Sequence, residues 1–194
     1  MRPRVLAFAG STRRESFNKK LVLRAATGAR AAGAEVTVLD LATLPLPLFD
    51  EDLERESGLP ANALELKRLM SEHHGFLISC PEYNSSITAV LKNAIDWASR
   101  KAEPAEKPLS AFRGKAAALM SASPGALGGL RGLVHVRAIL GNLGVIVLPD
   151  QRAVSRAHES LAEDGSLVDA KLDEAIQGLG STLVEVLTRL STSP

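Results

Sequence analysis

The stretch Val5-Leu6-Ala7-Phe8-Ala9-Gly10-Ser11-Thr12-Arg13-Arg14-Glu15-Ser16-Phe17-Asn18 changes character at Gly10 and decides the fold. Its first five residues are apolar, which is the pattern of a buried strand. Hydroxyl groups, two arginines and an asparagine follow, and from Lys19 onward the apolar residues recur with a helical period. Free backbone N–H groups and the positive end of the helix dipole would face one point there. The sequence therefore predicts a site for a terminal phosphate.

The spacing of this loop excludes the two commonest phosphate loops. A Rossmann fingerprint needs G-x-G-x-x-G, whereas Gly10 stands alone. A P-loop needs Gly-Lys followed by Ser or Thr, whereas Ala116 follows Gly114-Lys115. A phosphate held mainly by side-chain hydroxyls favours a mononucleotide and a flavodoxin-like architecture. The alternative is an ordinary turn in which Ser16 caps the helix.

Length and charge narrow the class of protein. A chain of 194 residues suits a single domain, here residues 1–194, with a sizeable core. Its net charge of +1 suggests neither a nucleic acid nor a membrane surface as partner. Cys80 is the only cysteine, so no internal disulfide can form. Residues 1–4 lead directly into a predicted strand, and we expect a cytoplasmic protein.

Strands and helices alternate along the whole chain. The apolar patterns predict strands at about 4–9, 36–39, 75–79, 115–120 and 145–148. They predict helices ending near 32 and at about 62–73, 87–99, 130–143 and 168–189. Residues 41–60 and 100–108 are expected to be loops, and 149–151 to follow the last strand. Five strands that alternate with five helices predict an α/β fold with one parallel sheet covered on both faces.

Ligands of such sheets bind outside the carboxyl ends of the strands, so three loops should converge: 10–18, 80–86 and 121–129. The second loop combines an aromatic ring with amide and carboxylate groups, a mixture that suits the apolar faces and polar edge of an isoalloxazine ring. The third loop contains three glycines, which can bring backbone N–H groups close to a flat ligand. For either loop alone, ordinary turn chemistry is the alternative.

Two motifs resemble the NADPH-dependent FMN reductase family. Residues 10–18 resemble its phosphate loop, and Pro81-Glu82-Tyr83-Asn84 with residues 91–97 resembles its second signature. The resemblance covers nearly the whole chain and implies a flavodoxin-like, doubly wound five-stranded parallel sheet of order 2-1-3-4-5. It also implies bound FMN, with NADPH or NADH as hydride donor to a small acceptor (a quinone, azo compound, free flavin or chromate-like oxyanion) by ping-pong exchange. Members are usually homodimers or homotetramers.

The resemblance also implies roles for individual residues. The FMN phosphate and ribityl chain would be surrounded by Ser11, Arg13, Ser16, Phe17 and Asn18. The ring would be held by Pro81, Glu82, Tyr83 and Asn84, and the site would be closed by Ser121 and Gly125. No side chain is expected to act as an obligatory acid or base, because the flavin carries the chemistry. Thr88 stands where family members often have proline.

Other interpretations stay open at this point. The chain could be a flavodoxin-type electron carrier or a non-catalytic flavin-binding regulatory module, because a fold does not fix a function. Cys80, Trp97 and Asp96 are expected to have structural roles, and Glu82 could pair across a subunit boundary. The loops 41–60 and 100–108 are expected to shape access for the acceptor.

Overall fold

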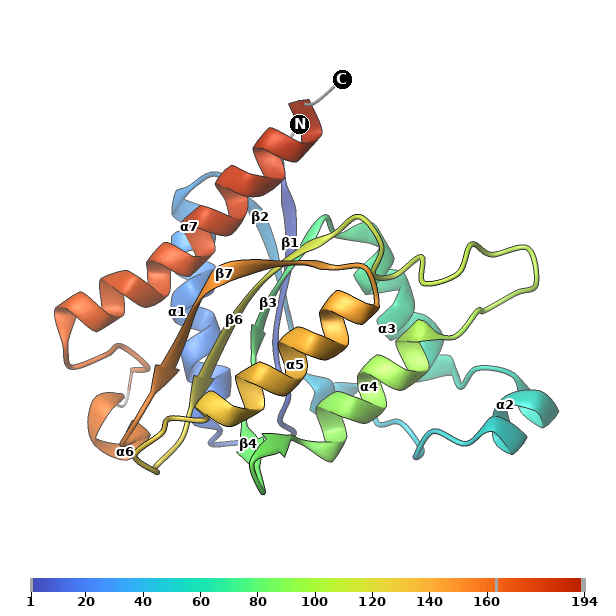
Figure 1. Cartoon of the computed structure of the whole chain (residues 1–194), viewed down its shortest axis with the longest axis horizontal. Helices are drawn as coiled ribbons and strands as arrows, with labels where there is room; N and C mark the ends of the chain where they lie inside the picture. Colours follow the sequence, from blue (N-terminus) through green and yellow to red (C-terminus); the bar gives the residue numbers. More distant parts are fainter. Residues whose placement is uncertain (1, 163, 193–194) are drawn as a thin grey trace.

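The computed structural model describes residues 2–162 and 164–192. Within them, a five-stranded parallel sheet has the order β2-β1-β3-β6-β7 (Figure 1). Its strands are β1 (Arg4–Ala9), β2 (Glu35–Leu39), β3 (Gly75–Ser79), β6 (Ala116–Ala122) and β7 (Ile146–Val154). Numbered among themselves, these strands have the order 2-1-3-4-5, so the predicted flavodoxin-like topology is confirmed.

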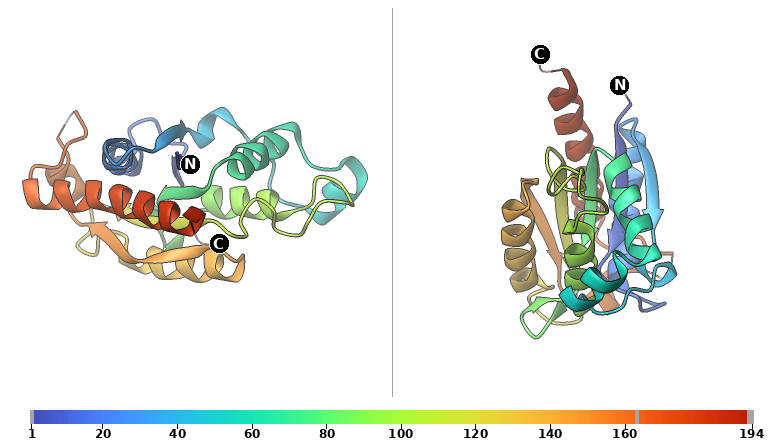
Figure 2. Two further views of the ribbon diagram at one scale, coloured as in Figure 1. Left: turned by 90° about the horizontal axis from the view of Figure 1, so that it is seen from above. Right: turned by 90° about the vertical axis from the view of Figure 1, so that its right-hand side faces the viewer.

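Helices cover both faces of the sheet (Figure 2). One face packs against α1 (Phe17–Ala31) and α7 (Ala170–Thr192), and the other against α3 (Ala61–Glu72), α4 (Ala89–Ser99) and α5 (Leu130–Asn142). Successive side chains of β1 enter the two cores in turn: Val5 and Ala7 the first, Leu6 and Phe8 the second. Burial on both faces explains why β1 is a continuous apolar run.

Helices α1 and α7 cross at very short distance because each has a glycine at the contact. A Cβ added at Gly180 would overlap the carbonyl oxygen of Ala25 in α1. A Cβ added at Gly28 would overlap the carbonyl oxygen of Gln177 in α7. The two backbones therefore touch without intervening side chains, and this contact fixes α7 against the sheet.

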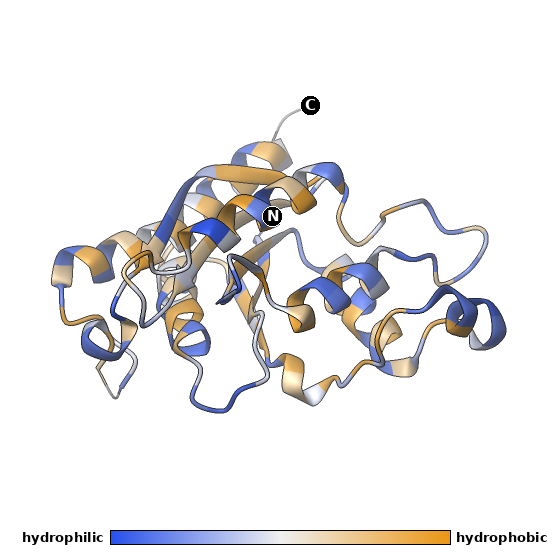
Figure 3. Cartoon of the chain, turned by 60° about the horizontal axis from the view of Figure 1, so that its bottom comes forward, coloured by the Kyte–Doolittle hydropathy of each residue, from blue (hydrophilic) through white to orange (hydrophobic). Residues whose placement is uncertain are grey.

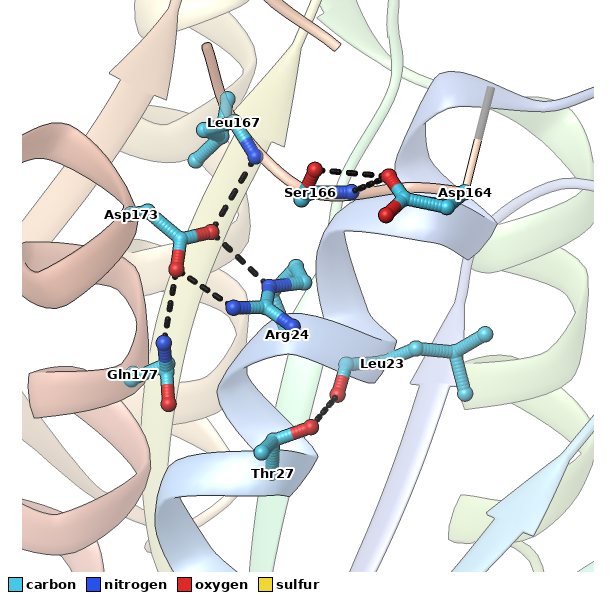
Figure 4. Close-up of polar contacts among 8 residues, drawn as sticks. All are labelled: Leu23, Arg24, Thr27, Asp164, Ser166, Leu167, Asp173 and Gln177. Atoms are coloured by element: carbon cyan, nitrogen blue, oxygen red, sulfur yellow. Dashed lines mark hydrogen bonds and ion pairs between the residues drawn. The ribbon is translucent and has the colours of Figure 1, made fainter. Parts of the chain in front are cut away.

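Figure 4 shows a polar cluster that joins the start of α7 to α1. Arg24 Nε and Nη2 donate to the two carboxylate oxygens of Asp173, at 2.8 and 2.5 Å. Asp173 also accepts from Gln177 Nε2 at 2.7 Å and from the backbone N–H of Leu167 at 3.1 Å. Chiefly because of the hydrogen bond from Arg24, the pKa of Asp173 lies below its ordinary value. The cluster holds the segment before α7 in place.

Residues 41–60 contain two short helices, so the expectation of a plain loop was wrong. They are η1 (Leu41–Thr43) and α2 (Glu51–Ser57). Asp50 accepts a hydrogen bond from the backbone N–H of Asp52 and caps α2, and Gly58, with a φ of +71°, ends it. A capping aspartate, an acidic first turn and a terminal glycine are helix signals that the sequence offered. None of its residues is buried, and Figure 3 shows α2 as a hydrophilic helix at the far right.

Strand β7 continues beyond its predicted end at residue 148. The stretch 149–151, expected after the strand, lies inside it, and the pairing with β6 shifts register there. Since β7 is an edge strand, Pro149 removes no hydrogen bond to a further strand. Arg137 of α5 donates to the carbonyl oxygens of Leu148 at 2.8 Å and Pro149 at 3.3 Å. These bonds supply the partners that the irregular stretch lacks.

A two-stranded antiparallel hairpin, β4 (Glu82–Tyr83) and β5 (Ser86–Ile87), occupies the loop expected at 80–86 and the first residue of the helix expected from 87. The helix α4 begins only after it. The two turn residues, Asn84 and Ser85, have φ angles of +50° and +67°. Two-residue hairpin turns favour positive φ at both central positions, because that geometry matches the twist of the strands.

Replacing Ser85 with glycine is expected to raise the free energy of unfolding by about 0.5 kcal/mol. Serine is strained at positive φ because of its Cβ, whereas glycine is not. Urea unfolding followed by circular dichroism measures the change. The Asn84→Gly variant is the matched control, with a smaller gain, since asparagine tolerates this conformation better. A loss of stability in Ser85→Gly would contradict the role assigned to the turn.

The remaining predicted elements lie within three residues of their observed bounds. One further helix, α6 (Ala157–Ser160), follows β7. The segment 100–108 lies between the end of α4 and the start of β6 (Figure 1), and its influence on access for the acceptor stays a prediction. Across residues 2–162 and 164–192, every helix is too short or too polar to cross a membrane.

Candidate functional site

Three loops at the carboxyl edge of the sheet surround one hollow of about 300 Å³. They follow β1, β3 and β6, as predicted, and lie at the bottom of Figure 1. Eight of the eleven predicted site residues line the hollow: Ser11, Arg13, Ser16, Phe17, Asn18, Pro81, Glu82 and Tyr83. The third loop contributes Ala122, Ser123 and Pro124 instead of the predicted Ser121 and Gly125, and Asn84 lies in the hairpin turn outside the lining.

The N-terminus of α1 offers donors for an anion at one end of the hollow. The backbone N–H groups of Phe17 and Asn18 donate to no other described residue. Ser16 has the backbone geometry of a cap, but its buried side chain makes no capping hydrogen bond. The Arg13 guanidinium lies 5.5 Å from the centre of the Phe17 ring, and no carboxylate of residues 2–162 and 164–192 pairs with it. This set of unpaired donors fits a phosphate.

Asn18 ties the first loop to the ends of two strands. Its Nδ2 donates to the carbonyl oxygen of Ala122 at 2.8 Å. Its Oδ1 accepts from Ser79 Oγ at 2.8 Å and from the backbone N–H of Ala122 at 3.0 Å. The side chain is buried, and its oxygen has no lone pair left for a ligand. Asn18 therefore sets the positions of β3 and β6 relative to the first loop, and a direct contact with FMN stays a prediction.

The second loop is fixed through the side chain of Glu82. Its carboxylate accepts from Arg131 Nη2 at 2.7 Å and from the backbone N–H of Gly132 at 3.0 Å. Partial burial opposes ionisation, but these hydrogen bonds keep the pKa of Glu82 below its ordinary value. Glu82 thus has a partner within its own chain. The neighbouring Tyr83 leaves 59% of its surface exposed beside the hollow.

The third loop is supported from behind by the corner between β7 and α6. The backbone N–H of Ser123 donates to Val154 at 3.1 Å, and that of Ala157 donates to Ser123 at 3.0 Å. Ser121 lies inside β6, fully buried, and its hydroxyl has no hydrogen-bond partner among the described residues. A Cβ added at Gly129 would overlap this hydroxyl. Sequence reasoning missed the supporting corner because it expected the strand to end before it.

Residues 3–159 match the sequence model of the NADPH-dependent FMN reductase family. The chain belongs to this family. A probable NADPH:quinone oxidoreductase of rice, Oryza sativa subsp. japonica, is 33% identical over 195 residues, which cover 98% of this chain and 92% of the relative. The predicted family and enzyme class, an oxidoreductase, are therefore confirmed.

Solved structures of other proteins show the same arrangement of elements. The flavoenzyme NAD(P)H:(acceptor) oxidoreductase of Paracoccus denitrificans superimposes with a TM-score of 0.80, at 28% identity, covering 96% of this chain and 98% of that one. A flavodoxin from the domain Archaea superimposes with a TM-score of 0.61 at 10% identity, covering 95% and 99%. The second likeness concerns the fold alone.

Thr88 links α4 to the first loop of the site. Its Oγ1 accepts from the backbone N–H of Leu91 at 3.1 Å and so caps α4, as expected. The same hydroxyl donates to the carbonyl oxygen of Gly10 at 2.7 Å. Proline could provide neither bond. The Thr88 hydroxyl holds α4 against the loop that follows β1.

The residues expected to be structural do pack or pair within the chain. Cys80 is fully buried, and burial raises the pKa of its thiol. Trp97 is buried and donates from Nε1 to the carbonyl oxygen of Pro47 at 2.8 Å. Asp96 pairs with Lys92 at 2.7 Å on the surface of α4. None of these three side chains lines the hollow.

Proposed function

We propose that this chain is an FMN-dependent oxidoreductase that takes hydride from NADPH or NADH and passes it to a small acceptor. The observation that carries the proposal is the convergence of three loops on one hollow, with the N-terminus of α1 and Arg13 at one end. Quinones are the first acceptor class to test, since the rice relative is named for a quinone. Azo compounds, free flavin and chromate-like oxyanions are the other classes.

The lining of the hollow fits FMN. The unpaired N–H groups at the start of α1, together with Arg13, Ser11 and Ser16, would hold the phosphate. Residues 81–83 and 122–124 would hold the ring between them. When bound, FMN supplies the hydride chemistry, and the side chains of this protein bind and orient it. None of them is assigned a proton transfer.

We propose a ping-pong order for the two substrates. Donor and acceptor would each need an open face of the same flavin ring to exchange hydride. They would therefore occupy it in turn. Parallel lines in double-reciprocal plots at several fixed acceptor concentrations are the expected kinetic pattern.

An anaerobic titration of the FMN-loaded protein with NADPH tests the proposal. Rapid and full loss of flavin absorbance is the expected result, followed by its return when a quinone is added. Flavin that stays oxidised with NADPH and NADH would point to an electron carrier or a regulatory module. A protein that does not retain FMN would exclude the assignment of all three loops.

Replacing Arg13 with alanine is expected to raise the Kd for FMN about tenfold to a hundredfold, because a charge-assisted contact to the phosphate is lost. Fluorescence titration of apoprotein with FMN measures it, and riboflavin, which has no phosphate, should show no such change. The neighbouring Arg14 does not line the hollow, so the Arg14→Ala variant is the matched control. Equal Kd values for wild type and Arg13→Ala would remove Arg13 from the site.

We also propose a homodimer or homotetramer. Leu127, just before α5, and Leu130 and Val134 in α5 each expose about half of their surface (50%, 44% and 59%), and a second copy would cover such a face. We infer that residues 1–194 act as one FMN-binding domain, because the described elements of the main sheet and its helices share two continuous cores. The nicotinamide donor supports a cytoplasmic location.

A further inference from the structure

One carboxylate joins two of the three loops around the hollow. Glu82 follows β3, whereas Arg131 and Gly132 lie in the first turn of α5, after the loop that follows β6. Glu82 Oε1 accepts from Arg131 Nε at 3.0 Å and from Nη2 at 2.7 Å, and Oε2 accepts from the backbone N–H of Gly132 at 3.0 Å. The Glu82 side chain is 9% exposed. The contact spans about 50 residues of sequence, and Glu82 itself lines the hollow.

Besides the contact made by Glu82, the hairpin is held by Ile87, which packs against the second core. Strands β4 and β5 pair only with each other and contain two residues each. A hairpin of this size is not stable alone. Its other polar contact to α5, between Ser86 Oγ and His135 Nδ1 at 2.8 Å, is exposed to water and so contributes less.

One glycine in α5, Gly132, permits the hairpin to approach so closely. A Cβ added at Gly132 would lie 3.3 Å from the carbonyl oxygen of Ser86 and 3.5 Å from Glu82 Cβ. The backbone N–H of Gly132 lies in the first turn of α5, where N–H groups have no acceptor within the helix. The helix dipole also favours a negative charge there. Glu82 supplies that charge, so this helix N-terminus is occupied by the protein itself.

We propose that Glu82 is a positioning residue for the flavin ring. Its carboxylate acts through α5 and fixes the spacing between residues 81–83 and residues 122–124, the two sides between which the ring would lie. This inference rests on the proposed function, and it assigns the side chain of Glu82 a task other than contact with FMN. The charge matters as well as the shape, because three N–H donors converge on two oxygens.

The Glu82→Gln variant tests this role, because glutamine keeps the size but replaces one acceptor with a donor. The expected result is a Kd for FMN about tenfold to a hundredfold above the wild-type value. The visible absorption bands of bound FMN are expected to shift, because the spacing between residues 81–83 and residues 122–124 around the ring would change. The thermal midpoint of the apoprotein is expected to change little, because the Arg131 partner is more than half exposed and the contact of Ile87 with the second core is unchanged.

The matched control is Glu54→Gln. Glu54 accepts from Arg100 Nε at 2.9 Å, and its side chain is 19% exposed, so it forms a similar glutamate–arginine pair, between α2 and the end of α4. Neither residue lines the hollow. A wild-type Kd and spectrum are expected in this variant. The Arg131→Met variant, which keeps the contact to Gly132, is expected to raise the Kd by a smaller factor and serves if Glu82→Gln fails to fold.

Two failures can be told apart. If wild-type protein does not bind FMN, the proposed function and the role of Glu82 both fall. If wild-type protein binds FMN while Glu82→Gln and Arg131→Met retain its Kd and its spectrum, only the role of Glu82 is overturned. An equal weakening by Glu54→Gln would also overturn it, because the effect would then follow from any lost ion pair.

Discussion

The Gly180→Ala variant is expected to lose about 3 kcal/mol of its free energy of unfolding. The added Cβ would overlap the carbonyl oxygen of Ala25 and lie 2.7 Å from the backbone nitrogen of Ala29. Both are backbone atoms of α1, so no side chain can rotate away. Helices α1 and α7 would have to separate, and the core between them would lose contact along the whole crossing.

Gly178, two residues earlier in the same helix, provides the control. A Cβ added there has no atom within 4 Å. Alanine is also a better helix former than glycine, so Gly178→Ala is expected to gain about 0.5–1 kcal/mol. Urea unfolding of the three proteins measures both changes. Opposite signs for the two variants support the backbone contact, whereas a gain in both would show that α1 and α7 are not packed so closely.

The sequence predicts both of these helices but not their contact. The apolar stripe of the last helix, with Leu183 and Leu187 in the core, identifies a buried face. It carries no information on which helix lies opposite or how near it comes. Gly28 and Gly180 are 152 positions apart, and each by itself lowers helix propensity. The two glycines stabilise the protein only where α1 and α7 pack against each other. This contact is a tertiary feature, and the periodicity of the sequence does not reveal it.

The site was largely predictable because one topological rule places it. Once the strands are assigned to a parallel sheet, loops that follow neighbouring strands must meet at the carboxyl edge. The rule selects loops but does not give the direction of each side chain. Ser121 illustrates this limit: it lies one residue inside β6, so the alternation of the strand turns it away from the hollow that Ala122 and Ser123 line.

Polar residues near a site also divide into those that face a ligand and those that hold the loops. Sequence position cannot separate them, because both kinds require hydrogen-bonding groups at the same loops. Asn18 and Glu82 were both expected to contact FMN, and the structure gives each a set of partners within the protein. Asn18 joins the first loop to β3 and β6, and Glu82 joins the second loop to α5. Together they connect all three loops.

The Asn18→Ala variant is therefore expected to lose FMN affinity by about a hundredfold or more, with about 3 kcal/mol less stability. The substitution leaves three buried groups without partners: Ser79 Oγ and both the N–H and the carbonyl oxygen of Ala122. Water admitted to satisfy them would separate the first loop from the third. Calorimetry gives the FMN affinity at a temperature where the variant is folded, and urea unfolding gives the stability.

Two further variants decide whether the effect comes from this connection. Asn62→Ala removes one exposed hydrogen bond, from Nδ2 to the carbonyl oxygen of Pro45, and should change stability by less than about 0.5 kcal/mol. Asn18→Asp keeps an acceptor for Ser79 Oγ and Ala122 N–H but faces the Ala122 carbonyl oxygen with no donor. It should fall between wild type and Asn18→Ala in both measurements. If Asn18→Asp instead bound FMN as weakly as Asn18→Ala while keeping wild-type stability, Asn18 would act on the ligand directly and the three loops would be held by other contacts.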